Sequence, residues 1–94
     1  MHSTIRSYSG VPGLVDGILA NQEEITRLLR DIPGFQAYYL IRTGETDAMS
    51  ISVYDDQGGT DASSQLAREW IAANLPGLAV SPPTVSAGEV VLRA

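Results

Sequence analysis

Two similar helix-ending phrases lie 43 residues apart in this chain of 94 residues. The first reads Leu-Leu-Arg-Asp-Ile-Pro-Gly-Phe over residues 28–35, and the second reads Ile-Ala-Ala-Asn-Leu-Pro-Gly-Leu over residues 71–78. Proline disfavours helical geometry in the residue before it and lacks a backbone N–H group, so helices are predicted to end at Ile32 and Leu75. The glycine that follows can close the helix in a left-handed conformation. The spacing predicts two similar strand-helix-strand halves, although two unrelated helices with a common stop signal would give the same pattern.

Hydrophobic periodicity predicts two helices. Between residues 14 and 32 the apolar side chains recur at helical spacing, with charged residues on the opposite side. A second helix is predicted to begin at Thr60 or Asp61, whose side-chain oxygen can cap the first turn, and to end before Pro76. Residues 55–59, Asp-Asp-Gln-Gly-Gly, are predicted to form a polar loop before this helix.

Four segments have the composition of strands. Residues 35–43 and 48–54 are rich in aromatic and branched side chains and flank a Gly-Glu-Thr-Asp turn, which predicts a hairpin. Residues 3–9 alternate in a strand-like way before a Gly-Val-Pro-Gly break. Residues 85–93 are predicted to form the last strand, after an extended Ser81-Pro82-Pro83 connection.

The predicted order is strand, helix, strand, strand, helix, strand. This order describes a ferredoxin-like βαββαβ fold, in which a four-stranded antiparallel sheet carries two helices on one face. The length is typical of one domain, so residues 1–94 are expected to form a single α+β domain. A domain of this size has a thin core, which favours an oligomer that covers more apolar surface.

The two faces of the predicted sheet differ in composition, because strand side chains point alternately to opposite sides. The odd-numbered set of the hairpin is apolar enough to lie beneath the helices: Phe35, Ala37, Tyr39, Ile41, Met49, Ile51 and Val53. The even-numbered set mixes tyrosine, arginine and small hydroxyl side chains, and protein interfaces favour tyrosine and arginine. An exposed sheet whose tyrosines pack across strands would show the same pattern. We expect a homodimer that is joined through Arg6, Tyr8, Tyr38, Arg42 and Tyr54.

Composition argues against several kinds of site and partner. The chain has no cysteine and one histidine, His2, so the usual zinc ligand sets are missing and no metal site is expected. All six basic residues are arginine, and a net charge of −5 offers no basic stripe for nucleic-acid phosphates. No apolar run reaches the roughly 18 residues that a membrane span needs, and the N-terminus lacks the layout of a signal peptide. A cytoplasmic protein with neither nucleic-acid nor membrane partners is the default expectation.

Two further sequence features, taken with the predicted element order, indicate a family resemblance. An Ile-Pro-Gly-Phe-x-x-Tyr-Tyr-Leu passage leads into the second strand at residues 32–40, and Trp70 lies in the middle of the second helix. Together they resemble the dimeric α/β-barrel superfamily, nearest the antibiotic biosynthesis monooxygenase-like families, over almost the whole chain. The resemblance implies two four-stranded sheets that close into a barrel between subunits, with a ligand cavity in each subunit between sheet and helices. Members include cofactor-independent oxygenases of polyketide-like aromatics, haem-degrading enzymes, dehydratases, isomerases and proteins with no established activity.

The resemblance also implies which side chains line that cavity. The oxygenase branch uses tryptophan, asparagine, tyrosine and arginine side chains to hold a phenolic substrate and its anion, with no cofactor. Trp70 and Asn74 are four residues apart on one helix face, which is expected to point toward Tyr39, and these three form the candidate ligand pocket. Core packing by Trp70 and helix capping by Asn74 are the alternative roles. The haem-degrading branch places an iron-ligating histidine on the second helix, whereas residues 60–75 contain none, so an iron-dependent haem activity is not expected.

Two functions stay open. The first is a cofactor-independent monooxygenase, or a related enzyme, that acts on an aromatic or polyketide-like small molecule. The second is a non-catalytic dimeric module that binds a small ligand or stabilises a partner. An open cavity with converging polar groups near Trp70 would favour the enzyme, whereas a space filled by Tyr39, Met49, Ile51 and Leu66 would favour the module. The sequence specifies neither the substrate nor the reaction.

Overall fold

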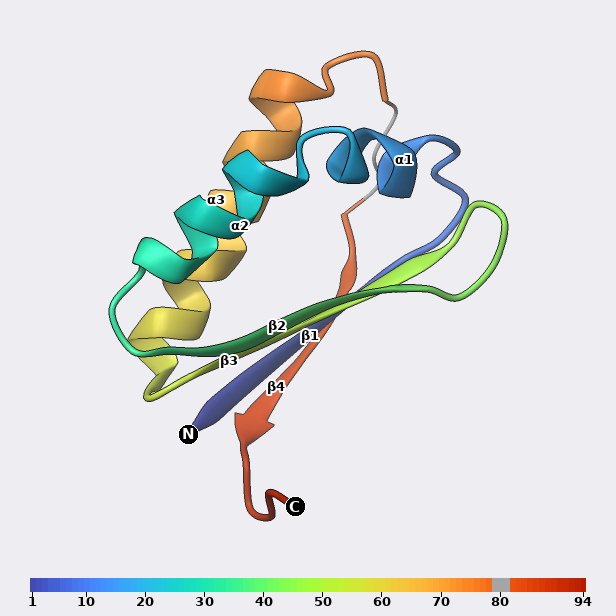
Figure 1. The fold of residues 1–94 in the computed structure, drawn as a ribbon. Helices are drawn as coiled ribbons and strands as arrows, with labels where there is room; N and C mark the ends of the chain where they lie inside the picture. Colours follow the sequence, from blue (N-terminus) through green and yellow to red (C-terminus); the bar gives the residue numbers. More distant parts are fainter. Residues whose placement is uncertain (79–81) are drawn as a thin grey trace.

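The structure, a computed structural model, describes residues 1–78 and 82–94, which form four strands and three helices (Figure 1). In chain order the elements are β1 (His2–Tyr8), α1 (Leu14–Leu19), α2 (Gln22–Asp31), β2 (Phe35–Arg42), β3 (Ala48–Tyr54), α3 (Gln57–Asn74) and β4 (Thr84–Glu89). The predicted element order is confirmed, except that the first helical segment is divided in two. Ser81 of the predicted extended connection lies outside the described residues, and Pro82 and Pro83 directly precede β4.

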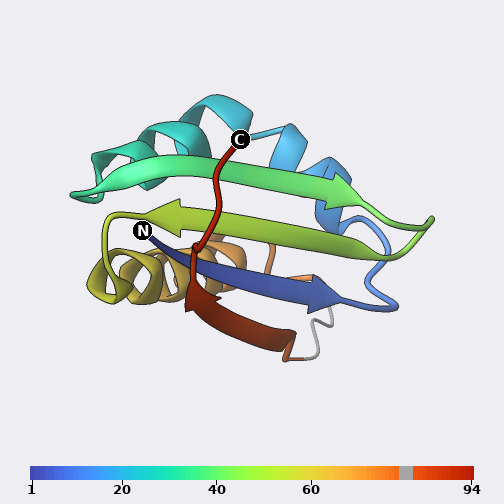
Figure 2. The same ribbon diagram turned by 90° about the horizontal axis from the view of Figure 1, so that it is seen from below.

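The strands form one antiparallel sheet in the order β2-β3-β1-β4, with β1 and β3 in the centre (Figure 2). All three helices lie on the same side of this sheet, and its other side is uncovered (Figure 1). The predicted ferredoxin-like α+β fold is therefore confirmed. Within the described ranges, none of the helices combines the length and the apolar character that a membrane span requires. The cytoplasmic location stays a prediction.

The single first helix predicted from periodicity is two helices. α1 ends at Leu19 and α2 begins at Gln22, because Asn21 leaves helical geometry with φ −121° and ψ 28°. The Asn21 side-chain amide donates to the Gly17 carbonyl at 3.0 Å, which satisfies one of the free carbonyls at the end of α1. The apolar pattern does not reveal this break, since the buried residues of both helices fit one helical stripe: Leu14, Ile25 and Leu29.

α3 begins earlier than the sequence predicted. Its N-cap is Asp56, whose carboxylate accepts a hydrogen bond from the Gly59 backbone N–H at 3.0 Å. Gln57, Gly58 and Gly59, assigned to a polar loop from their composition, therefore form the first turn of the helix. Gly59 is buried against Tyr54, and this close approach explains why a glycine stands in a helical turn.

Both Pro-Gly phrases end a helix, as predicted. α2 stops at Asp31, before an extended Ile32, and α3 stops at Asn74. Gly34 adopts the left-handed conformation with φ 85°, whereas Gly77 is not among the glycines with positive φ. The two phrases therefore share a stop signal and differ in the backbone geometry that follows it.

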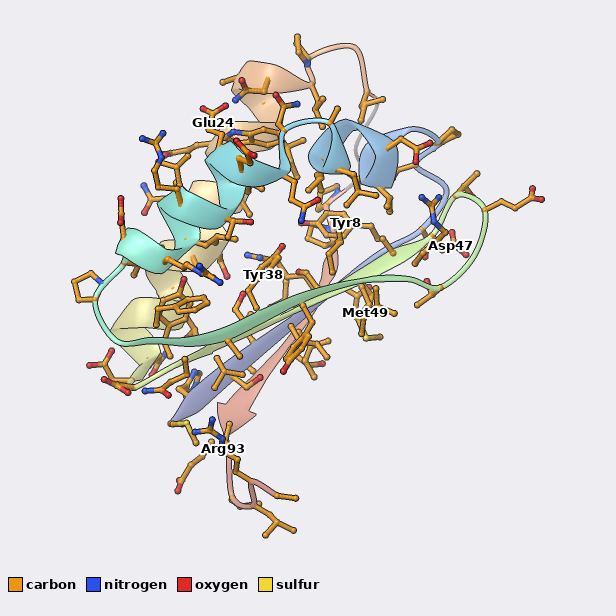
Figure 3. The ribbon with its side chains drawn as sticks, viewed as in Figure 1. Tyr8, Glu24, Tyr38, Asp47, Met49 and Arg93 are labelled. Carbon is orange, nitrogen blue, oxygen red and sulfur yellow. The ribbon has the colours of Figure 1, made fainter. Side chains whose placement is uncertain are left out.

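The predicted assignment of the sheet faces is wrong, because the even-numbered side chains lie beneath the helices. Arg6 and Tyr54 are 3% and 0% exposed, whereas Tyr39 on the opposite face is 59% exposed. Figure 3 shows Tyr8 and Tyr38 between the sheet and the helices, with Met49 on the opposite side of the sheet. The more apolar face is thus the uncovered one, and the more polar face is roofed by helices.

The grouping of side chains by face is largely confirmed. Cross-strand pairs place Tyr39 beside Ile51, and Ile51 beside Ile5, on one face. Phe35 is the exception, because a register shift between Phe35 and Ala37 turns its ring to the helix side, where it packs edge-on against Tyr54 at 5.7 Å between centroids. We call the uncovered surface the open face; its apolar residues are Ile5, Ala37, Tyr39, Ile41, Met49, Ile51 and Val53.

The space between helices and sheet contains an apolar cluster and a layer of polar groups. The apolar cluster consists of Tyr8, Val11, Leu14, Ile25, Leu29, Trp70 and Ile71. The buried polar residues, nearly all hydroxyls, are Thr4, Arg6, Ser50, Ser52, Thr60 and Ser63. Hydrogen bonds join the sheet to α3 within this layer, as when the Ser63 hydroxyl donates to Ser52 Oγ at 3.0 Å. Because buried hydroxyls need partners, such bonds allow a polar sheet face to be covered.

Candidate functional site

The three residues predicted to line a ligand pocket are not brought together. Trp70 is buried in the apolar cluster beneath the helices, whereas Tyr39 stands on the open face. Asn74 is exposed at the end of α3, where its amide donates to the Trp70 carbonyl at 3.0 Å. Asn74 therefore has the alternative role of a helix cap, and the sheet separates Tyr39 from Trp70.

The dimer interface predicted through the even-numbered residues is also wrong. Arg6, Tyr8 and Tyr54 are buried within one chain, and Tyr38 lies half-buried on the same side. Arg42 is exposed near α1, where its Nη2 lies 3.0 Å from Asp16 Oδ1. The helices already cover this face, so it has no room for a second chain.

Tyr54 ties β3 to α2. Its hydroxyl donates to the Leu29 carbonyl at 2.7 Å. Burial raises the pKa of Tyr54 to about 12, assisted by the Tyr38 phenol and opposed by the Arg6 guanidinium and the Ser63 hydroxyl. Tyr54 is therefore a neutral hydrogen-bond donor at ordinary pH.

Tyr54→Phe is expected to lower the free energy of unfolding by about 1–2 kcal/mol, because the buried Leu29 carbonyl loses its short hydrogen bond. The wild type should also lose stability as pH rises from about 10, the unfolded pKa of tyrosine, toward 12, since unfolding allows the phenol to ionise. Urea unfolding between pH 7 and pH 12 measures both effects. The alkaline loss should be smaller in Tyr54→Phe, with the remainder from Tyr8, and identical pH profiles for the two proteins would contradict this role.

The described residues offer little for a metal or for haem iron. None of them forms a group of three or more histidine, cysteine, aspartate or glutamate side chains suited to a metal ion. α3 carries no histidine. His2 lies in β1 with Nδ1 2.9 Å from Thr60 Oγ1, and the Thr60 hydroxyl donates to the Gln57 carbonyl, so it accepts from His2. The chain therefore does not fit an iron-ligated haem held by α3.

Arg6 is a buried cation with an incomplete set of hydrogen bonds. Its Nε donates to Ser50 Oγ at 3.2 Å. Nη1 and Nη2 are buried and have no acceptor among the described residues. In that part of the chain the only ion pair joins Arg42 to Asp16, so Arg6 has no described counter-ion. A buried, uncompensated charge is strongly unfavourable, and such groups are concentrated at functional sites.

Two cavities adjoin this region. A small one of about 20 Å³ beside Trp70 and Ser50 has room for a single water molecule. The other is an open groove of about 720 Å³ between α3 and the β1–β4 edge of the sheet. Tyr8 and Ile71 line both, which places the two spaces next to each other. We call the larger one the α3 groove; its lining includes Arg6, Tyr8, Arg68, Ile71, Leu78 and Val85.

The polar groups around these cavities are mainly donors. Trp70 Nε1 is a third buried nitrogen without an acceptor in the described ranges. Burial raises the pKa of Tyr8, opposed by the nearby Arg6 guanidinium, so Tyr8 adds a neutral phenol. Arginine and tryptophan side chains can only donate hydrogen bonds. The site is therefore suited to hold acceptor oxygens, above all negatively charged ones.

Sequence reasoning found part of this site and missed the rest. Arg6 was singled out for a different role, and Arg68 was not considered. A usable signal existed on α3, because Ser64, Arg68 and Ile71 follow each other at spacings of four and three residues and so share one helix face. The neighbours of Arg6 follow from register, which pairs it with Ser50 on β3 and Val85 on β4.

Comparison with known proteins gives a fold. No family model matches the sequence, and no curated protein matches it. A candidate antibiotic biosynthesis monooxygenase from Bordetella bronchiseptica is 20% identical with a TM-score of 0.70, and the match covers 97% of this chain and 97% of that one. SnoaB from Streptomyces nogalater, a cofactor-independent oxygenase solved as a point mutant, is 17% identical with a TM-score of 0.62, covering 99% of this chain and 93% of that one.

A third solved structure is the heme-degrader MhuD from Mycobacterium tuberculosis with two hemes in its active site. It is 17% identical with a TM-score of 0.65, and the match covers 100% of this chain and 99% of that one. At identities this low the likeness establishes the fold, and any chemistry has to be argued from the residues of the site. The chain has the ferredoxin-like fold of the antibiotic biosynthesis monooxygenase-like structures, as the sequence resemblance predicted.

Proposed function

We propose that this chain is a cofactor-independent oxygenase of an aromatic or polyketide-like compound. The compound binds in the α3 groove, where Arg6 holds one of its oxygen atoms, and a second oxygen enters the adjoining small cavity beside Trp70. The observation that carries the proposal is the presence of three buried donor nitrogens without acceptors among the described residues: Nη1 and Nη2 of Arg6 and Nε1 of Trp70. The fold likeness to SnoaB, a cofactor-independent oxygenase, supports this class of chemistry.

The proposed chemistry uses the substrate as its own reductant. Buried donors favour an ionised oxygen over a neutral one, so they lower the pKa of a phenol or enol at this position. Loss of that proton activates a CH₂ carbon of the substrate that is conjugated with the ionised oxygen. The resulting anion transfers electrons from this carbon to O₂. One oxygen atom stays on that carbon as a carbonyl, and the other leaves as water with the two hydrogens that the carbon loses. O₂ is the only co-reactant that this balance needs.

A non-catalytic binding module is the second candidate, and two observations favour it. The small cavity beside Trp70 has room for one water and none for an aromatic ring. None of the described residues that line the α3 groove is a histidine or a carboxylate, so the groove offers no ordinary general base. An oxygenase must therefore act on a compound acidic enough to ionise through contact with the donors.

Trp70→Phe is the variant that tests the proposed site, because phenylalanine keeps an aromatic ring in the core and removes the Nε1 donor. We expect members of a panel of phenolic and anthrone-type aromatics to raise the wild-type Tm, and an oxygen electrode to record O₂ uptake with the same compounds. In Trp70→Phe the uptake should fall by about tenfold or more, as the loss of one donor to a charged oxygen predicts.

Asn74→Ala is the matched control, since Asn74 lies one turn further along α3 and its amide is occupied by the Trp70 carbonyl. It should bind and turn over the same compounds as the wild type. Binding without O₂ uptake would establish the module instead of the oxygenase. Equal behaviour of wild type and Trp70→Phe would remove Trp70 from the site.

We further propose that the chain forms a homodimer through the open face. Side chains of this face are exposed in the single chain although they are apolar, as with Tyr39 at 59% and Ile41 at 39%. Beyond β4 the tail leaves the sheet on the same side, and its Val91 and Leu92 are 87% and 84% exposed (Figure 1). A contiguous apolar surface of this kind is typical of a protein contact. The predicted partner, a second copy of this chain, is retained on the face opposite to the one first assigned.

A further inference from the structure

We infer that the ligand of the α3 groove is an apolar carboxylic acid, whose carboxylate pairs with the Arg6 guanidinium and whose apolar body lies along the groove. The inference rests on the proposed function, since it specifies the substrate class of the same site. It adds one requirement: the group that meets Arg6 is a permanent carboxylate of the ligand, so the oxygen that ionises during the reaction meets Trp70 Nε1.

The first argument is charge. The chain carries a net charge of −5, yet the described residues that line the groove include two arginines and no aspartate or glutamate. Arg6 is 3% exposed and lacks a counter-ion in the described ranges, whereas Arg68 is exposed on α3. This groove is therefore a positive site on an acidic protein, and it attracts an anion.

The second argument is hydrogen-bond geometry. Nε of Arg6 is occupied by Ser50 at 3.2 Å, which leaves the two terminal nitrogens, Nη1 and Nη2, without described acceptors. Arginine holds its N–H groups in a planar fork that matches the two oxygens of a carboxylate. A neutral carbonyl would supply one oxygen and no charge, and so would leave the buried cation uncompensated.

A trapped water does not account for these nitrogens. The small cavity with room for one water is lined by residues that include Tyr8, Ser50 and Trp70, and its lining does not include Arg6. Arg6 instead forms part of the lining of the open groove. Nη1 and Nη2 are buried in the chain without a ligand, so the guanidinium must turn toward the groove for a carboxylate there to complete its hydrogen bonds.

The third argument is the apolar wall beyond Arg6. The groove is lined by apolar side chains and prolines. The apolar side chains are Ile71 of α3, Leu75 and Leu78 just after it, and Val85 of β4. A volume of about 720 Å³ is in the range of ordinary small-molecule sites. The groove therefore combines a deep cation with an apolar channel, which is the complement of an acid with an aromatic or aliphatic body.

Titration calorimetry with two matched probes tests the inference. 2-Naphthoate and 2-naphthamide have the same ring system and differ in charge at the group that would meet Arg6. We expect the wild type to bind the acid about tenfold more tightly than the amide at pH 7, as a charge-assisted pair predicts. Equal affinities, or no binding of 2-naphthoate at millimolar concentration, would overturn the inference.

Arg6→Met locates the effect and provides a second readout. It should abolish the preference for the acid, while the Tm without ligand rises by roughly 4 °C or more because a buried, unpaired charge is removed. A purely structural arginine would instead lower the Tm when it is replaced, and that result would overturn the inference. Arg27→Met is the control, and we expect it to change 2-naphthoate binding by less than about twofold, because Arg27 is exposed on α2 and does not line the groove.

The experiments distinguish failure of the carboxylate ligand from failure of the proposed oxygenase activity. Equal binding of acid and amide in the groove, together with O₂ uptake on a neutral phenol, would remove the carboxylate and leave the oxygenase. Selective binding of 2-naphthoate that is lost in Arg6→Met, with no O₂ uptake on any compound, would uphold the carboxylate site and remove the oxygenase.

Discussion

Gly59→Ala is expected to lower the free energy of unfolding by about 3 kcal/mol or more, the upper range for overpacked cores. A Cβ at this position would lie 2.6 Å from Tyr54 Cβ and 2.8 Å from both Cγ and Cδ2 of the same ring. These atoms lie close to the β3 backbone. Tyr54 is fully buried and its hydroxyl is bonded to the Leu29 carbonyl, so the ring cannot turn away. Relief therefore requires that α3 move away from the sheet.

Gly58→Ala is the matched control, one residue earlier in the same helical turn. A Cβ there meets only Asp56 Oδ1, at 3.3 Å, and the position is exposed. Alanine favours helices over glycine, but its Cβ would press on the Asp56 oxygen that caps α3, so this variant should stay within about 1 kcal/mol of the wild type. Urea unfolding of the three proteins measures the difference. Equal stability of Gly59→Ala and Gly58→Ala would show that α3 does not pack on Tyr54 in this way.

The element order could be predicted from the sequence because its signals are local. Each Pro-Gly phrase fixes a helix end through the covalent geometry of proline, and this holds in the structure at Ile32 and at Leu75. The errors at helix starts are local too. Asn21 interrupts a helix through its own side-chain bond, and Asp56 caps α3 ahead of two glycines that seemed to belong to a loop.

The sheet faces could not be assigned from hydrophobicity, because the more apolar face is exposed in the single chain and the more polar face lies beneath the helices. The usual inference places the more apolar side beneath the helices. Here the helix side contains Arg6, Ser50 and Ser52, which are buried and each take part in a side-chain hydrogen bond. Departures from such local rules are expected at functional or strained sites. The reversal therefore supports our proposal that the site lies on the polar face.

The candidate site could be predicted less well than the fold, since it depends on tertiary proximity. Trp70 was predicted from the family resemblance. Tyr39 was placed beside it because the sheet faces were assigned the wrong way round, and Asn74 was placed in the same pocket although it caps the end of α3. Nothing local distinguishes Arg6 from other strand arginines. Its burial, and its lack of an acceptor in the described part of the chain, emerge only once α3 lies over β1.

If the chain dimerises through the open face, as proposed, Tyr39→Asp is expected to convert the dimer into a monomer. Tyr39 lies in the central row of the open face beside Ile51, and its 59% exposure means that the single chain gains little from burying it. A tyrosine in the middle of a contact can contribute about 2 kcal/mol or more, and an aspartate there would also bury a charge on each side. We expect sedimentation of the wild type at micromolar concentration to give twice the mass of one chain, and the dissociation constant of Tyr39→Asp to rise by about a hundredfold or more.

Leu19→Asp is the control that assigns this effect to the open face. Leu19 is an apolar residue with 50% exposure at the end of α1, on the helix side of the sheet. The same substitution there should leave the sedimentation mass unchanged, because that side is not proposed to meet a second chain. A monomeric wild type would refute the dimer. If Leu19→Asp dissociates the dimer and Tyr39→Asp does not, the contact lies on the helices. The apolar open face would then remain exposed in the dimer, which is unusual for a patch of this kind.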